Sequence, residues 1–389
     1  MRNSRKIVRI AAAFVVAMSG AALGAHPAAA DPQGDQRLRV TRFLGEQRLP
    51  HRMMFNGTTV GGISGLDRDP RTGTWYLISD DRWRYNPARF YTGSLNFNRE
   101  SGAFTGVSLT GVTTLKRADG SPYPGYGLPE SADPETIRFD PWTRRLLWGH
   151  EGDRPDDRNP NIPISDLFVR WAGTDGRHLG ELPIPANLKM TDTTSGPRRN
   201  FGFEGLTFAP RTIAAVVEGP RYEDGEPSTV EHGAPARITV WSRGGRPIGQ
   251  YVYPVDPLPA APVPPTGWTD TGVSEILAID DSRYLALERS WLEGVGYRVR
   301  LYEIDRSHAT NVIGRDRLAG DLQYRPVSKR LVLDLGTRQE PEQNLEGLAW
   351  GPKLRTGECT LVLAADDNFD PGEVGQFLAY GVRGCPASR

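Results

Sequence analysis

Acidic residues recur at one place in five similar segments of the chain. These residues, with a serine in the first segment, are Ser64, Glu135, Glu204, Glu275 and Glu346, and they lie 71, 69, 71 and 71 residues apart. Carboxylates brought together in space can bind a metal ion or transfer protons to and from a substrate. We therefore predict that the four glutamates are catalytic residues of one shared site.

A second set of acidic residues lies 13 to 21 residues after the first. It comprises Asp80, Asp81, Glu151, Glu218, Glu288, Asp366 and Asp367. Carboxylates a few ångströms apart raise each other's pKa, so this many acids in one place require cations. Calcium prefers oxygen ligands, and the repeats contain almost no histidine or paired cysteine that would favour zinc. We predict that the second set binds calcium.

Four arginines supply positive charge beside the second set. Arg82, Arg154, Arg221 and Arg289 each follow one of its acids within a few residues. Because a guanidinium group binds phosphate oxygens bidentately, these arginines are predicted to bind a small phosphoester or another anionic substrate. The alternative is that the repeated Glu–Arg pairs clamp neighbouring repeats and bind no ligand.

Two other residues have side chains suited to catalysis. His150 precedes Glu151, and the ordinary pKa of histidine suits a general acid or base, although a hydrogen-bonded structural imidazole is the alternative. Ser64 stands where the other segments have glutamate. Its surroundings lack the second glycine of a nucleophile elbow, and a strand–helix turn is not expected here, so a nucleophilic serine is disfavoured.

The regular spacing of the segments predicts a closed or stacked array of one structural unit. Each repeat begins with two short strands, such as 137–139 and 145–148, and two further strands follow in the first four repeats. The fifth repeat lacks its outer strand, and the segment 38–49 is expected to supply it by pairing near 376–382. The predicted fold is an all-β propeller of five four-stranded blades, whereas six blades would require extra strands in 306–326.

The topology of a blade predicts where both acidic sets lie. In an antiparallel sheet the first strand begins at the same end at which the second strand finishes, so both sets should face one rim of the central channel. Long loops such as 118–134, 187–199 and 256–270 fall at that end. Long loops on one face of a rigid scaffold usually mark the working face.

The N-terminus and the cysteines predict export. Basic residues precede an apolar run at 10–23, and Ala28-Ala29-Ala30 has the form of a cleavage site, so residues 1–30 are predicted to be a signal peptide and 31–389 a single propeller domain. Cys359 and Cys385 are predicted to form a disulfide. The balance of 47 Lys+Arg against 47 Asp+Glu gives no reason to expect nucleic acid or membrane as a partner. We expect a secreted, soluble monomer.

Taken jointly, the motifs of these segments resemble the phytase-like domain family of exported bacterial proteins, described by the esterase-like activity of phytase. The motifs are Gly62-Ile63-Ser64-Gly65-Leu66, Ser79-Asp80-Asp81-Arg82, Asp133-Pro134-Glu135, Phe203-Glu204-Gly205-Leu206, Leu287-Glu288-Arg289, Asn344-Leu345-Glu346-Gly347-Leu348 and Asp366-Asp367-Asn368-Phe369. The resemblance covers essentially the whole mature chain. It implies a β-propeller whose repeated acids take part in phosphoester hydrolysis. The extended pattern of the calcium-dependent β-propeller phytases is not found, so phytate is not implied as the substrate.

The residues and the resemblance together predict a secreted, calcium-dependent phosphoesterase with its site at the channel mouth. Two alternatives remain open at this point. One is a propeller that binds a ligand or a surface at the same mouth without catalysis, and the other is a lactonase-like, metal-dependent esterase.

Overall fold

The computed structural model describes residues 37–98, 100–320, 323–338 and 342–386. Its strands form five four-stranded antiparallel sheets. The first sheet contains β4 (Ile63–Arg68), β5 (Trp75–Ser79), β6 (Arg89–Phe97) and β7 (Phe104–Thr114). The second contains β8 (Pro134–Asp140), β9 (Arg145–His150), β10 (Phe168–Ala172) and β11 (His178–Glu181). The third contains β12 (Phe203–Phe208), β13 (Thr212–Val217), β14 (Ala234–Ser242) and β15 (Pro247–Val255).

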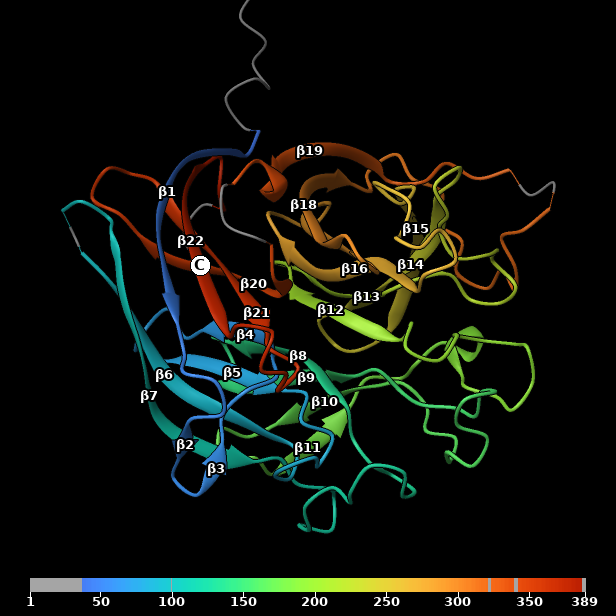
Figure 1. Cartoon of the computed structure of the whole chain (residues 1–389), viewed down its shortest axis with the longest axis horizontal. Helices are drawn as coiled ribbons and strands as arrows, with labels where there is room; N and C mark the ends of the chain where they lie inside the picture. Colours follow the sequence, from blue (N-terminus) through green and yellow to red (C-terminus); the bar gives the residue numbers. More distant parts are fainter. Residues whose placement is uncertain (1–36, 99, 321–322, 339–341, 387–389) are drawn as a thin grey trace, which may run out of the picture. The chain divides into compact units, whose positions relative to one another are not determined.

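The remaining sheets complete a ring of five blades, which is a β-propeller (Figure 1). The fourth contains β16 (Thr269–Ala278), β17 (Arg283–Leu292), β18 (Gly296–Asp305) and β19 (Ser328–Asp334). The fifth contains β20 (Asn344–Lys353), β21 (Cys359–Asp366), β22 (Gln376–Arg383) and β1 (Arg39–Arg48). The short elements outside the blades are β2 (Met54–Phe55), β3 (Thr58–Thr59), and the 3₁₀ turns η1 (Ala186–Leu188) and η2 (Leu335–Thr337). The first strands β4, β8, β12, β16 and β20 gather in the middle of the ring.

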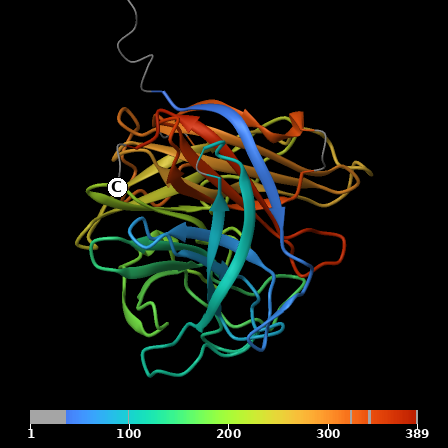
Figure 2. The same cartoon turned by 90° about the vertical axis from the view of Figure 1, so that its left-hand side faces the viewer.

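The N-terminal strand closes the ring as the sequence predicted. β1 pairs antiparallel with β22, from Arg39 opposite Arg383 to Arg48 opposite Gln376, and the two strands lie side by side in Figures 1 and 2. The described residues of segment 306–326 contain no strand, so five blades are confirmed over six. The predicted signal peptide lies outside the described residues.

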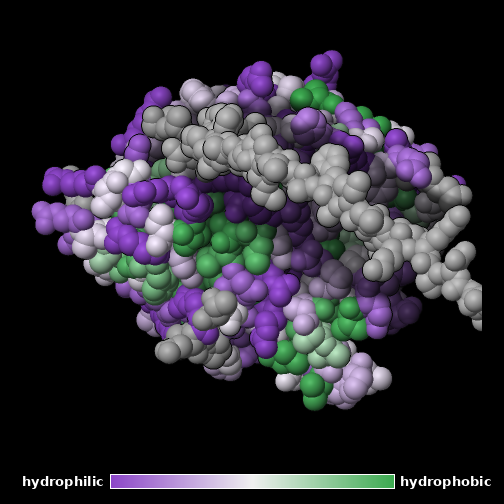
Figure 3. All heavy atoms as spheres, turned by 90° about the horizontal axis from the view of Figure 1, so that it is seen from above, coloured by the Kyte–Doolittle hydropathy of each residue, from purple (hydrophilic) through white to green (hydrophobic). Residues whose placement is uncertain are grey.

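Apolar clusters between neighbouring blades hold the ring together. One cluster joins β9 of the second blade to β12 and β14 of the third through Leu147, Leu206 and Trp241, all of which are fully buried. Four similar clusters fill the other contacts between blades. Because each blade packs on its neighbours, a chain of this length can be stabilised without one large core. Hydrophilic residues cover much of the face in Figure 3, around smaller apolar patches.

Arg138 joins all five blades at the centre of the ring. This β8 residue is 1% exposed and forms an ion pair with Glu275 of β16 at 2.7 Å. Its guanidinium group also donates to main-chain carbonyls on the first strands of the four other blades. The acceptors are Leu66, Leu206, Ile276 and Leu348, at 2.7, 2.5, 3.2 and 2.9 Å. The middle of the ring therefore contains a buried charged side chain whose donors are satisfied by one carboxylate and four backbone carbonyls.

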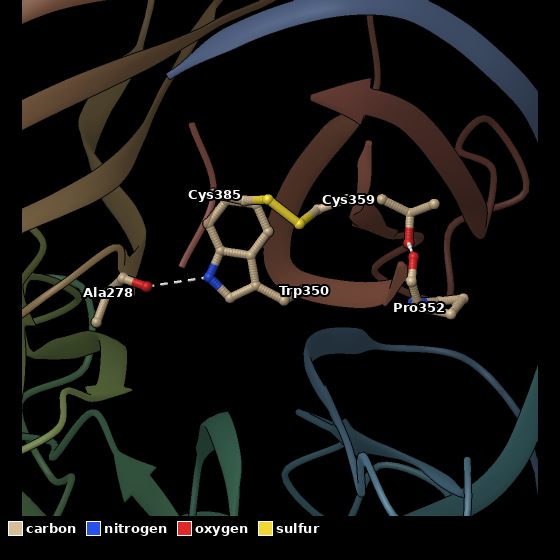
Figure 4. Close-up of a disulfide and its surroundings, with 6 residues drawn as sticks. Ala278, Trp350, Pro352, Cys359 and Cys385 are labelled. Atoms are coloured by element: carbon tan, nitrogen blue, oxygen red, sulfur yellow. Dashed lines mark hydrogen bonds between the residues drawn. A yellow bond between two sulfur atoms is a disulfide. The ribbon is translucent and has the colours of Figure 1, made fainter. Parts of the chain in front are cut away.

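The fifth blade contains the predicted disulfide. Cys359 at the start of β21 is bonded to Cys385, which follows β22, and the bond lies beside Trp350 (Figure 4). The indole N–H of Trp350 donates to the carbonyl of Ala278 at 3.0 Å and so links this blade to the fourth. Within the described ranges, no helical element combines the length and the hydrophobicity that a transmembrane span requires.

Candidate functional site: an acidic cavity at the channel mouth

A β-bulge at one position of each first strand begins the site. The pairing with the second strand skips one residue in every blade, and the skipped residues are Ser64, Glu135, Glu204, Ser274 and Glu346. A bulge redirects its side chain relative to the regular strand. The fourth repeat is therefore shifted by one residue from the sequence alignment, so Ser274, and not Glu275, corresponds to the glutamates of the other blades.

Glycine is frequent at the position after the bulge because neighbouring first strands leave little room for a side chain there. A Cβ atom added to Gly65 would lie 2.8 Å from the carbonyl oxygen of Glu135, and one added to Gly205 would lie 2.7 Å from the nitrogen of Ile276. First strands of adjacent blades thus approach too closely for a side chain at these points. Glu275 takes this place in the fourth blade, and its carboxylate forms an ion pair with Arg138 and does not line the cavity that the other three glutamates share.

A cavity of about 340 Å³ opens at the channel mouth. Three predicted catalytic residues, Glu135, Glu204 and Glu346, line it together. The other residues that line it are Asp80, Arg82, Asn200, Trp268, Asp270, Arg289, Trp291, Tyr297, Asn344, Asp366, Asn368 and Glu373. Blades that are far apart in the sequence therefore contribute acids to one space.

The carboxylates near the cavity form two overlapping groups that can hold a metal ion. Ligand atoms of Asp80, Asp133 and Glu135 lie within 4.8 Å of one another, and so do those of Glu135, Glu151 and Glu204. Asp133 Oδ1 is buried and has no hydrogen-bond partner among the described residues. The donor set consists of oxygen atoms alone, which suits calcium better than zinc.

Two of the four predicted arginines lie among these acids. Arg82 Nη2 is 2.7 Å from Asp133 Oδ2, and the side chain is 31% exposed. Arg289 Nη2 is 2.8 Å from Glu218 Oε1 and 3.6 Å from Glu346 Oε1, and its side chain is 8% exposed. Carboxyl groups still outnumber guanidinium groups, so the arginines alone do not neutralise the site.

The other two arginines lie elsewhere. Arg154 donates to the carbonyls of Ser195 and Pro197, at 2.7 and 2.9 Å, and holds that loop in place. Arg221 pairs with Glu223 at 2.7 Å and is 3% exposed. Neither lines the acidic cavity, so their predicted contact with a substrate at this site is not supported by their positions.

The second acidic set is also divided by the structure. Asp80 and Asp366 line the cavity, Glu151 belongs to a metal-compatible group, and Glu218 pairs with Arg289. In the fourth blade, Glu288 pairs with the residue just before the bulge. Arg289 therefore takes the position that these acids take in the other blades.

Asp81, Glu288 and Asp367 have structural partners outside the cavity. Asp81 accepts from the backbone N–H of Tyr85 and Asn86, both at 2.8 Å, and pairs with Arg89 at 2.5 Å. Asp367 accepts from the backbone N–H of Gly62 at 2.9 Å. Glu288 lies 2.6 Å from Lys329 and accepts from the Tyr253 hydroxyl at 2.9 Å. These contacts connect loops and blades.

His150 is a buried structural residue in this fold. It is 1% exposed, its Nδ1 accepts from the backbone N–H of Asp133 at 2.9 Å, and its Nε2 lies 3.0 Å from Ser165 Oγ. Burial lowers the pKa of His150 to about 4, so the ring is neutral at physiological pH. It holds the backbone of Asp133 in place and is not among the residues that line the cavity.

Burial is the main cause of raised pKa values at the site, and neighbouring carboxylates add to it. The pKa of Glu151 rises to about 8 and that of Glu346 to about 7, while Arg82 and Arg289 respectively oppose the rise. The pKa values of other carboxyl groups are held well above their usual range by the same causes. These groups are Asp80, Glu135, Glu204, Glu218 and Asp366.

These shifts predict that the metal-free protein loses stability as the pH rises from about 4.5 to 8. A carboxyl group with a raised pKa binds its proton more tightly in the folded state, so folding is favoured at low pH and that advantage is lost as the pH rises through the folded pKa. In chelator, Tm should fall by at least about 3 °C over this range. Saturating calcium should reduce the fall, and a Tm that rises throughout would contradict the assigned shifts.

Several residues of the site were not predicted. Asp133 and Asn344 lie two residues before bulged glutamates, where Gly62 and Gly202 stand in other blades. Polar residues in a place otherwise taken by glycine were a signal that could have identified them. Asp270, Trp268 and Tyr297 carry no repeated pattern, because they lie in or beside an extension of the fourth blade past the Gly272–Arg289 pair, where the first hairpins of the other blades have already ended.

Solved structures similar to this chain have low identity. An exo-β-1,3-galactanase from Phanerochaete chrysosporium is 12% identical with a TM-score of 0.43, and the match covers 89% of this chain and 64%, less than two thirds, of that one. A protein of unknown function from Dyadobacter fermentans is 10% identical with a TM-score of 0.38, covering 89% and 99%. A putative hydrolase from Bacteroides ovatus is 12% identical with a TM-score of 0.35, covering 83% and 86%.

No curated protein is a significant match to the chain. A family model does match residues 58–369, which include all five bulged strands and both arginines of the cavity. Its description is phytase-like, with the esterase-like activity of phytase. Since the match spans most of the described propeller, the chain belongs to the phytase-like family.

Proposed function

We propose that the protein is a calcium-dependent phosphoesterase whose reaction takes place in the acidic cavity. One observation carries the proposal: buried carboxyl groups crowd around two arginines, and Asp133 Oδ1, Glu218 Oε2 and Asn344 Oδ1 lack hydrogen-bond partners among the described residues. Ionised carboxylates are unfavourable in such surroundings unless a cation joins them. Membership of the phytase-like family supports ester hydrolysis.

Asp80, Asp133 and Glu135 are the residues that would hold the ion. One carboxylate oxygen of Asp133 contacts Arg82, and the other has no partner among the described residues. Asp133 can therefore contact the guanidinium group and a calcium ion at the same time. When bound, calcium would supply Lewis acidity toward a phosphoryl oxygen and would lower the pKa of a bound water. The oxygen-only donor set fits this ion.

The remaining steps can be assigned to side chains of the cavity. Glu346, with a pKa of about 7, can accept a proton from the attacking water near neutral pH. Water adds to phosphorus, the ester P–O bond breaks, and the leaving alcohol receives a proton from a neutral carboxyl group such as Glu204, whose pKa is well raised. Arg82 is partly exposed and lines the cavity, so it can contact a phosphate oxygen.

Export to an oxidising compartment is part of the proposal. The Cys359–Cys385 disulfide suits such a compartment, and the N-terminal residues have the features of a signal peptide. We further propose that the mature protein acts as a monomer.

A thermal melt with and without calcium tests the proposed function. An ion that binds only the folded state stabilises it by RT ln(1 + [L]/Kd), which is about 2.7 kcal/mol at a hundredfold excess over Kd. Calcium should raise Tm, chelator should reverse the rise, and 4-nitrophenyl phosphate should be hydrolysed only with calcium. Asp80→Asn should weaken both effects, whereas Glu181→Gln, which changes a side chain that is 56% exposed on β11, should not.

The other outcomes separate the alternatives. Calcium-dependent stability with turnover of lactones but not of phosphoesters would favour the lactonase-like esterase. Calcium-dependent stability without turnover of either substrate would favour a binding propeller. No effect of calcium on Tm and no turnover would remove the proposal.

A further inference from the structure

Two turns of the propeller share a sequence pattern and an unusual backbone. Asp80-Asp81-Arg82-Trp83 lies at the end of β5, and Asp366-Asp367-Asn368-Phe369 lies at the end of β21. The third and fourth residues have φ of 49° and 63° in the first turn, and 46° and 51° in the second. Bulky residues with positive φ are strained and uncommon. Both turns therefore place their aromatic residue on an unusual, strained backbone.

The two aromatic side chains have different surroundings. Phe369 is 2% exposed and packs on Tyr85, with ring centroids 4.9 Å apart. Trp83 is 42% exposed. Burial of Phe369 offsets the strain of its turn, whereas Trp83 has the same strained backbone without comparable burial of its indole. Packing in the core therefore does not explain why a tryptophan stands at position 83.

Trp83 lines a groove of about 630 Å³ that adjoins the acidic cavity. Tyr126, which is 45% exposed, lines the same groove. The residues common to the groove and the cavity are Asp80, Arg82, Asn200 and Asn368. A molecule with one end among the carboxylates can therefore extend past Arg82 to the two aromatic side chains.

Tyr126 is also held in place. Its hydroxyl oxygen accepts from Arg199 Nη2 at 2.8 Å, and Arg199 is fixed in turn by Asp153 at 2.8 Å and Asp156 at 3.2 Å. The neighbouring Gly125 lies against Trp83, since a Cβ atom there would be 3.9 Å from that of Trp83. Side chains positioned before a ligand arrives lose less entropy on binding it.

We propose that this groove binds the leaving group of the substrate, and that this group carries a flat, weakly polar ring that stacks on Trp83 and Tyr126. The inference rests on the proposed phosphoesterase activity, which places the reacting phosphate in the adjoining cavity. Aromatic stacking adds a modest favourable term to that of buried area, in a geometry that favours flat rings. Trp83 and Tyr126 thus set which alcohol the site accepts.

Benzyl phosphate and ethyl phosphate provide the test, because both release an alkyl alcohol and only the first has a ring. In calcium, Trp83→Ala should raise KM for benzyl phosphate about three- to tenfold and leave KM for ethyl phosphate nearly unchanged. Trp83→Phe should restore most of the affinity. The matched control is Trp142→Ala, which removes an indole that is 59% exposed and lies outside both spaces.

Equilibrium binding by calorimetry distinguishes failure of this inference from failure of the proposed function. If both esters are hydrolysed but Trp83→Ala affects them equally or not at all, the inference is overturned and the phosphoesterase remains. If neither is hydrolysed, weaker binding of benzyl phosphate to Trp83→Ala than to Trp142→Ala supports the groove alone. Absence of both turnover and selective binding overturns both.

Discussion

Replacement of Glu135 by glutamine is expected to reduce phosphoester hydrolysis by two to three orders of magnitude while the protein stays folded. Glu135 belongs to both metal-compatible groups, so loss of its charge affects each of them. The size of the effect follows the roughly 10²–10³-fold loss seen when one main charge-stabilising group is removed from an active site. The variant should be compared with the wild type by kcat, KM and calcium-dependent Tm.

The stability of the Glu135→Gln variant separates a functional role from a structural one. In chelator its Tm should equal or exceed that of the wild type, because removal of one buried carboxylate relieves repulsion among its neighbours. The rise in Tm caused by calcium should shrink. Glu181→Gln should behave as the wild type in both measurements. A variant that loses stability in chelator and keeps its calcium response would show that Glu135 is a clamp.

Replacement of Arg138 by methionine is expected to destabilise the fold by about 3–5 kcal/mol, the range found when one partner of a buried ion pair is removed. The change leaves Glu275 without its cation and four main-chain carbonyls without their donor. Glu275 retains hydrogen bonds from the backbone N–H of Leu206 and Ile276, so its burial becomes less favourable without becoming wholly unsatisfied.

Urea denaturation measures this effect, with Arg211→Met as the control. Arg211 is 83% exposed and pairs with Asp281 at the surface, so its loss should change the free energy of unfolding little. The double variant Arg138→Met with Glu275→Gln should recover part of the stability, since it removes the unpaired charge. If Arg138→Met is as stable as Arg211→Met, then Arg138 does not hold the blades together at the centre.

The sequence was sufficient to predict the fold because the repeat spacing and the missing outer strand determine a closed ring. The pairing of 38–49 with the last blade followed from strand count alone, and the disulfide followed from Cys359 and Cys385 being the only cysteines. Both predictions depend on the order of strands and cysteines along the chain. Neither depends on the direction of a single side chain.

The site was harder to predict because its membership depends on a register of one residue. Glu275 and Glu288 looked equivalent to the other acids, yet the bulge in β16 places Ser274 and Arg289 in the corresponding positions. A shift of one residue in a strand turns a side chain to the opposite face. Asp81, Asp367 and His150 were predicted site residues, but they accept hydrogen bonds from backbone N–H groups of the fold. No sequence pattern reveals those donors.

Crystals soaked with calcium should show directly, by difference density, whether the acidic cavity binds the ion. We expect a strong peak at the channel mouth among carboxylate oxygens of Asp80, Asp133 and Glu135, at calcium–oxygen distances of about 2.3–2.6 Å. The peak should be absent after chelation and weakened in Glu135→Gln. A cavity that contains only water at saturating calcium, in crystals that remain well ordered, would contradict the proposal that this acidic cavity is a metal-dependent hydrolase site.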